Sequence, residues 1–306
     1  MSEASGITAV IISCEDAEVI DPCLASVAGW VDEIVVVDMN SGDGTRDIAA
    51  RYGARVVDHE RLPFVEPVRT FAMTQATRPW VLLLDPDERV GRSLVARLRA
   101  VVGEDAWDVV DIPFIQIVFG RRLTAPGGQD GPHPRLLRRD GATWPAQIHE
   151  HPVFPGLRRL DLSAEPRWRE RDLAIFHETW RSPHQVFEKL ARYIPKDAER
   201  RLARGETFSF SGLVRGVAQV FELRLIRGRS WEDGMAGLLH TSLFAVMELG
   251  AQAEMWQQQG HPPGPDAAVR RWGRCTAPLR YLGSAVRQVR KVSRRLRRIR
   301  ARRGRD

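Results

Sequence analysis

Two aspartates, Asp85 and Asp87, follow an apolar run in the segment VLLLDPDERV (81–90) and give the sharpest chemical signal in the chain. Oxygen ligands at this spacing suit Mg²⁺ or Mn²⁺, which bind few protein carboxylates and keep positions for phosphate oxygens. A metal held there can bridge a diphosphate and stabilise the charge that develops when a group leaves. The competing interpretation is an ordinary acidic turn that caps a helix beginning near Arg92.

A third acid, Asp38, ends the apolar run EIVVVD (33–38) and precedes the turn-rich NSGDGT. Its carboxylate could accept hydrogen bonds from a base or a ribose. Asp43 is expected to be structural, because Asp-Gly is a strong turn former and Asp43 or Thr45 can cap the next helix.

Apolar runs and helical segments alternate through the first part of the chain. Strands are expected at 7–13, 33–38, 54–58 and 80–84, with helices at 17–29, 45–52 and 64–77 between them. This alternation indicates an α/β fold with a mostly parallel sheet flanked by helices. Ligands bind such sheets at the carboxyl ends of the strands, so Asp38 and Asp85 should converge on one crevice.

The second part of the chain changes character. Strand-like sequence at 107–119 and 135–138 flanks a Gly/Pro-rich loop at 125–134, and long helices are expected at 183–204, 211–227 and 231–258. We therefore predict three parts: an α/β domain at 1–182, a helical extension packed on it at 183–260, and a linker with a basic tail at 261–306.

Charge is distributed unevenly along the 306 residues. The formal net charge is +7, but 15 Lys and Arg fall in 270–305, which leaves 31 basic and 38 acidic residues in 1–269. Apolar residues recur at spacings of three and four in the tail, at Leu282, Val286, Val289, Val292, Leu296 and Ile299. This pattern predicts a basic amphipathic helix over 279–305 that lies on an anionic membrane surface.

Two other partners for the tail stay open. An arginine-rich arm also neutralises nucleic-acid phosphates. However, no aromatic residue follows Tyr281 to stack on bases, and the body is acidic, so the sequence disfavours nucleic acid. The tail could instead contact its own acidic domain.

Cysteine usage and hydropathy indicate the compartment. Cys14, Cys23 and Cys275 are scattered and match neither a disulfide framework nor a zinc motif. The N-terminus has no basic region ahead of its apolar run, and no stretch approaches the roughly 20 apolar residues of a membrane span. We expect a cytoplasmic protein, peripheral at the inner face of the cell membrane.

The spacings of four histidines also match no zinc pattern: His133, His149, His151 and His177.

Many spaced residues together match a known pattern. They are the VIIS strand, Cys23-Leu24, Ser26-Val27, Trp30, Asp32 through Asp38, Ser41, Asp43-Gly44-Thr45, Ile48-Ala49, Arg69, Ala72, Ala76 and Trp80 through Arg89, followed by Arg135-Leu136, Arg138-Arg139, Ile148-His149-Glu150, His177, Lys189, Arg192-Tyr193, Trp231 through Gly234, and Gly237. With them, residues 7–256 resemble an inverting family 2 glycosyltransferase of GT-A fold. The resemblance is to the bacterial lipopolysaccharide-core and β-glucosyltransferase branch.

The resemblance implies that a sugar moves from a nucleotide-sugar donor to a hydroxyl of a cell-envelope glycan or glycolipid, with Mg²⁺ or Mn²⁺. It also implies site residues. Ser13, Asp16 and Asp38 would line the nucleotide pocket, Arg69 would approach the diphosphate, and Asp85 and Asp87 would form the Asp-x-Asp pair, with Asp87 as the direct metal ligand.

The general base is assigned in the same way. Glu150 is the candidate, and His149 is the second candidate or a metal ligand. A pair of polar residues at a surface strand end is the alternative. Cys14-Glu15-Asp16, Met39-Asn40 and Thr70 depart from the family pattern and leave the base and sugar of the donor open.

Two other functions are compatible with the sequence. One is a non-catalytic nucleotide- or sugar-binding protein, against which the intact Asp85-Pro86-Asp87 argues. The other is a glycosyltransferase that acts on a soluble metabolite or a protein.

Overall fold

The computed structural model describes residues 6–63, 65–129, 131–141, 156–262 and 264–276. The chain forms two compact units. The first comprises Met1–Lys189 with Phe221–Leu243, and the second comprises Leu190–Val220 with Phe244–Asp306. The predicted three-part division of the chain stays a prediction.

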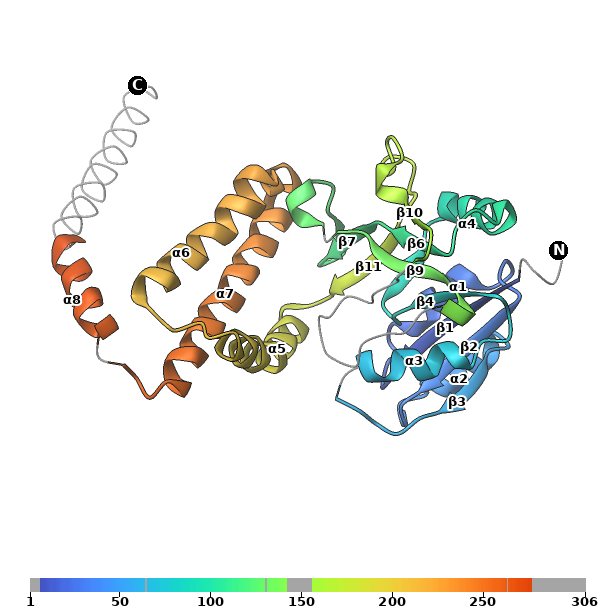
Figure 1. The fold of residues 1–306 in the computed structure, drawn as a ribbon, viewed down its shortest axis with the longest axis horizontal. Helices are drawn as coiled ribbons and strands as arrows, with labels where there is room; N and C mark the ends of the chain where they lie inside the picture. The colour runs from blue at the N-terminus through green and yellow to red at the C-terminus, as the bar shows by residue number, and fades with distance from the viewer. Residues whose placement is uncertain (1–5, 64, 130, 142–155, 263, 277–306) are drawn as a thin grey trace, which may run out of the picture. The chain divides into compact units, whose positions relative to one another are not determined.

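A seven-stranded sheet forms the centre of the first unit, in the order β10-β6-β9-β4-β1-β2-β3 (Figure 1). The strands are β1 (Ile7–Ser13), β2 (Glu33–Asp38), β3 (Arg55–Asp58), β4 (Trp80–Leu84), β6 (Val109–Ile112), β9 (His133–Arg138) and β10 (Arg159–Asp161). Only β9 runs antiparallel to its neighbours β4 and β6. The predicted mostly parallel α/β sheet is confirmed.

Helices cover both faces of this sheet because its central strands are apolar on both faces. Alternate residues of β4 enter two different core clusters, Leu82 and Leu84 one and Val81 and Leu83 the other. The first cluster includes residues of α1 (Ile20–Val27), α2 (Thr45–Arg51) and α4 (Arg92–Glu104), and the second includes residues of α3 (Glu66–Thr74). Burial on two faces explains why β4 reads as a continuous apolar run.

A second, four-stranded sheet has the order β5-β11-β7-β8. Its strands are β5 (Glu88–Val90), β7 (Phe114–Val118), β8 (Arg121–Arg122) and β11 (Ile175–Trp180). The single strand-like run predicted at 107–119 is therefore two strands in two sheets, β6 and β7, which meet at Pro113. Proline has no N–H for a ladder hydrogen bond, so the pairing changes there.

Short helical turns and several longer helices make up the rest of the described residues. The 3₁₀ turns are η2 (Pro126–Gly128), η3 (Arg139–Gly141), η4 (Leu162–Ala164) and η6 (Ser230–Asp233). The later helices are α5 (Pro183–Ala203), α6 (Phe210–Val220), α7 (Gly234–Gln258) and α8 (Gly264–Thr276). The helix predicted at 211–227 changes after α6 into a π-helix, η5 (Phe221–Arg227).

One helical stretch is long and apolar enough to be compared with a membrane span. Ser230–Gln258 meets the length and hydropathy of a membrane span, with mean hydropathy 1.2 and 28% of the window buried. By its length and composition, this stretch contradicts the expectation that no part of the chain approaches a membrane span. The core helix of a soluble protein can meet the same criteria, so this stretch is weak support for a span.

Candidate active site

The Asp85-Pro86-Asp87 turn joins β4 to β5, so the chain passes here from the first sheet to the second. Burial of the whole of β4 fixes where Asp85 emerges, at the carboxyl end of the strand. Asp38 ends β2 at the same edge, with β1 between the two strands. Neither aspartate of the turn caps α4, because its N-cap residue is Gly91 and no side chain bonds there. The capping interpretation is therefore wrong.

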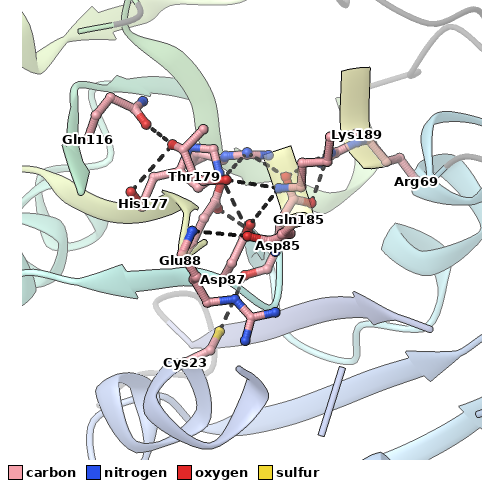
Figure 2. A network of polar contacts seen from close by, with 12 residues as sticks. Cys23, Arg69, Asp85, Asp87, Glu88, Gln116, His177, Thr179, Gln185 and Lys189 are labelled. Carbon is pink, nitrogen blue, oxygen red and sulfur yellow. Dashed lines mark hydrogen bonds and ion pairs between the residues drawn. The ribbon is translucent and has the colours of Figure 1, made fainter. Parts of the chain in front are cut away.

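Two arginines hold the carboxylate of Asp85, and one of them, Arg69, is labelled in Figure 2. Arg69 Nη2 donates to both of its oxygens, at 2.9 and 3.1 Å, and Arg135 Nη2 donates to Oδ2 at 3.0 Å. Burial alone would raise the pKa of Asp85, but the two guanidinium groups outweigh it and hold the pKa well below its usual range. Asp85 therefore stays ionised and well fixed.

Glu88 is fully buried beneath this pair and supports it. Its Oε2 accepts the backbone N–H of Asp85 at 3.0 Å, and its Oε1 forms an ion pair with Arg135. Burial raises the pKa of Glu88 to about 7, although the Arg135 charge opposes the rise. Arg135, from β9, therefore joins Glu88 and Asp85 into one buried network.

Asp87 faces different partners. His177 Nε2 lies 3.5 Å from its Oδ1, and Lys189 Nζ lies 3.6 Å from its Oδ2. The pairing of β11 with β5 brings His177 here, because His177 is in register with Glu88 and Glu178 N–H donates to Asp87 O at 2.9 Å. Burial would lower the pKa of His177, but the Asp87 carboxylate raises it to about 8.

These residues fit a divalent cation at Asp87. Its side chain is 19% exposed, and its carboxylate is an oxygen donor 3.5 Å from His177 Nε2. The imidazole becomes a nitrogen donor when it releases the proton that Asp87 favours, and one metal ion can then bind both groups. Among the described residues, no group of three or more His, Cys, Asp or Glu is placed to hold a metal. The remaining ligands would come from water and phosphate, as Mg²⁺ commonly arranges them.

The residues expected around the nucleotide lie on β1 and β2 and in the loops that follow them. Ser13 Oγ and Cys14 N–H donate to Asp16 Oδ2 at 2.9 and 2.8 Å. Burial raises the pKa of Asp16. Asp38 is buried, and its Oδ2 accepts from Ser41 N–H at 3.0 Å and pairs with Arg46.

Asp38 Oδ1 is also buried and has no hydrogen-bond partner among the described residues. An unpartnered buried acceptor is costly, so this oxygen is suited to accept from a ligand or a water.

Asp43 has the structural role expected of it. Its Oδ1 accepts from the backbone of Thr45 at 3.1 Å, and its Oδ2 accepts from Ala17 N–H at 2.9 Å. The side chain therefore ties the start of α2 to the loop after β1.

Some of the predicted residues lie outside the part of the chain that the structure describes. Glu150 and His149, the candidates for the general base, lie outside the described residues, as does the basic tail at 279–305. Trp168 and Trp180, side chains of a type that can stack on a sugar face, are buried.

The sequence assigns no role to four members of the cluster: Glu88, Arg135, His177 and Lys189. Glu88 follows the two aspartates directly, and Arg135 is a charged residue between Pro134 and Leu136 in the buried part of β9. Both are unusual places for a charge, because buried Glu and Arg need partners. That signal could have marked them, but only the strand pairing shows what they contact.

Residues 8–161 match the family model described as Glycosyl transferase family 2. The chain belongs to glycosyltransferase family 2. The match covers both aspartates of the turn and Arg69. It follows that the protein is a nucleotide-sugar-dependent transferase.

Curated relatives cover most of the transferase. An uncharacterized glycosyltransferase of Rickettsia bellii (strain RML369-C) is 38% identical over 246 residues, which are 78% of this chain and 82% of the relative. One of Rickettsia felis (strain ATCC VR-1525 / URRWXCal2) is 36% identical over 246 residues, which are 78% of this chain and 85% of the relative. The lipopolysaccharide core biosynthesis glycosyltransferase LpsC of Rhizobium meliloti (strain 1021) is 24% identical over 274 residues, 85% and 95% of the two chains.

Other matches are shorter or more distant. A TPR repeat-containing protein of Synechococcus elongatus is 36% identical over 86 residues, and the match spans only 21% of its length. The crystal structure of S. aureus TarS 1-349 is similar with a TM-score of 0.43 and 17% identity, over 83% of the transferase and 92% of that chain.

Proposed function

We propose that the transferase moves one sugar, with inversion, from a nucleotide-sugar donor to a hydroxyl of a cell-envelope glycan or glycolipid, and that it requires Mg²⁺ or Mn²⁺. One observation carries the metal part. Asp85 accepts hydrogen bonds at 2.9 to 3.1 Å from two arginines, whereas Asp87 has the longer ion pairs, with His177 at 3.5 Å and Lys189 at 3.6 Å. Asp87 is therefore the carboxylate that can accept a metal.

The donor is assigned to the carboxyl edge of the first sheet. Asp38 Oδ1 supports this assignment, because it is a buried acceptor in need of a donor. Ser13 and Asp16 would line the same pocket, and Arg69 would contact the diphosphate from α3. Asp85, held by its arginines, would keep the turn in place for the donor.

A divalent cation bound at Asp87 and His177 would stabilise the negative charge on the leaving nucleoside diphosphate. The protein must also remove a proton. We assign this to Glu150, with His149 as the second candidate. The acceptor oxygen forms a bond to the anomeric carbon, its proton passes to the base, and the electron pair of the broken bond stays on the leaving phosphate oxygen.

Two observations support the acceptor and the location. LpsC, a relative at 24% identity, is named for lipopolysaccharide core biosynthesis. The basic, amphipathic segment at 279–305 suits an anionic membrane, where lipid-linked acceptors are found. We therefore propose a cytoplasmic enzyme, peripheral at the inner face of the membrane.

The donor and metal can be tested together. Purified protein is incubated with a panel of nucleotide-sugars, with and without Mn²⁺ or Mg²⁺, and released nucleoside diphosphate is measured. Release should require the metal, and Asp87→Ala should abolish it. Unchanged release by the variant would overturn the metal assignment.

Flotation with vesicles tests the location. The full chain should float with vesicles that contain anionic lipid and not with neutral vesicles. Failure to float, together with a nucleic-acid gel shift, would favour the rival partner for the tail.

A further inference from the structure

The two aspartates of the turn are held by their cations with unequal strength. Asp85 accepts hydrogen bonds at 2.9 to 3.1 Å from two arginines whose side chains are only 8% exposed. One of them, Arg135, is fixed in turn by buried Glu88. Asp87 has only the longer ion pairs at 3.5 and 3.6 Å. The cations at Asp87 are therefore the ones that can be exchanged.

Lys189 has the longer and more flexible side chain of the two cations at Asp87. It lies near the start of α5, its side chain is 27% exposed, and its Nζ donates to the backbone oxygen of Thr179 at 3.1 Å (Figure 2). An ammonium group is a compact charge with three donors on a flexible stem. The Thr179 bond uses one donor, so the group can remain anchored while it changes its anionic partner.

A divalent cation at Asp87 would remove that partner. Like charges that share one carboxylate repel each other, and the repulsion is strong where burial lowers the dielectric screening. The ammonium group of Lys189 would then need another anion within reach. A diphosphate bound to the same metal is the anion that its position offers.

We propose that Lys189 is a donor-binding residue, which exchanges the Asp87 carboxylate for the diphosphate of the nucleotide-sugar when a divalent cation binds Asp87. This inference rests on the proposed function, because it requires a metal at Asp87. It assigns Lys189 two opposite effects. Without nucleotide, Lys189 competes with the metal, and with nucleotide it strengthens binding of the diphosphate.

If Lys189 had only a structural role, its replacement would not strengthen Mn²⁺ binding and weaken nucleotide binding at the same time. Measuring both affinities therefore tests the proposal. Isothermal titration calorimetry measures Mn²⁺ alone, and then the diphosphates of uridine, guanosine, adenosine and thymidine at saturating Mn²⁺. Lys189→Met should bind Mn²⁺ about threefold more tightly, as loss of a partly exposed competing ion pair predicts. It should bind the accepted nucleoside diphosphate about tenfold more weakly, as loss of a charge-assisted contact predicts.

Two further variants serve as references. Lys189→Arg keeps the charge and should restore most of the nucleotide affinity, and Lys196→Met makes the same chemical change further along α5 and should alter neither constant. Thermal unfolding confirms that each variant is folded, and Lys189→Gln replaces Lys189→Met if the latter is not.

The outcomes separate this inference from the function on which it rests. Loss of Mn²⁺ binding in Asp87→Asn with unchanged constants in Lys189→Met would overturn the role of Lys189 alone. Weaker binding of both Mn²⁺ and nucleotide in Lys189→Met would also overturn it. Unchanged Mn²⁺ binding in Asp87→Asn would overturn the metal site, and with it the proposed function.

Discussion

Replacing Arg135 by methionine should be among the most damaging single changes in the first unit. Arg135 is 7% exposed and is the ion-pair partner of Glu88, which is 0% exposed. Methionine fills similar space but leaves the Glu88 carboxylate buried without its cation and removes one hydrogen bond from Asp85. Breaking one side of a buried ion pair in this way costs about 3–5 kcal/mol of unfolding free energy.

A second substitution should recover part of that loss. Glu88→Gln removes the buried charge and keeps an amide oxygen that can accept the Asp85 N–H. The double variant Glu88→Gln/Arg135→Met should therefore be more stable than Arg135→Met by about 1–3 kcal/mol, the usual range of coupling between contacting residues. Transferase activity should stay low in both variants, because Asp85 has lost one of the donors that fix it.

Urea unfolding followed by tryptophan fluorescence measures the stability of the two variants. Arg51→Met is the matched control, because Arg51 and its partner Asp21 have side chains 66% and 52% exposed and such pairs contribute about 1 kcal/mol or less. If Arg135→Met were no less stable than Arg51→Met, the buried network would not be the support that its geometry indicates.

Three other changes test the surroundings of the site by the same unfolding assay. Gly91→Ala places a Cβ 2.4 Å from the backbone oxygen of Asp172, so we expect the free energy of unfolding to fall by about 1–3 kcal/mol. A change near zero would show that the two backbone segments can move apart at little cost. Burial, with the Arg224 charge, lowers the pKa of His240 to about 3 from 6.5, so the unfolded chain binds a proton that the folded chain does not, and stability should fall by up to about 1.4 kcal/mol per pH unit below pH 6.5. His240→Phe should lack that slope, measured from pH 7 to 4. Asp233→Ala removes the acceptor for the N–H and hydroxyl of Thr124 and should lower the free energy of unfolding by about 1–3 kcal/mol. An unchanged urea midpoint would show that these two hydrogen bonds do not stabilise the fold.

The first half of the fold was predictable from the sequence because its signals are local. The strands at 7–13, 33–38 and 80–84 have the predicted bounds, since each is an apolar run that ends at a polar residue or a turn. The helix ends differ by a few residues, as at Glu66–Thr74 against the predicted 64–77. Terminal residues of helices carry little hydrophobic signal.

The second sheet was not predicted as a separate sheet, for a physical reason. β5 has only three residues and continues directly from the aspartate turn, and β11 mixes polar and apolar residues without a clean alternation. Their pairing depends on partners far away in the sequence. The two aspartates could be located from the sequence because their signal is local. Their contacts with Arg135, His177 and Lys189 could not be predicted, because they depend on this long-range pairing.

The second sheet also limits how this enzyme can diverge. His177 lies opposite Glu88 in the antiparallel ladder, with Phe176 and Glu178 on either side of it in the sequence. Because alternate residues of a strand point to opposite faces, inserting or deleting one residue in β11 would turn the imidazole away from Asp87. Length changes during evolution should therefore be confined to the connections outside this ladder, while substitutions within it remain possible.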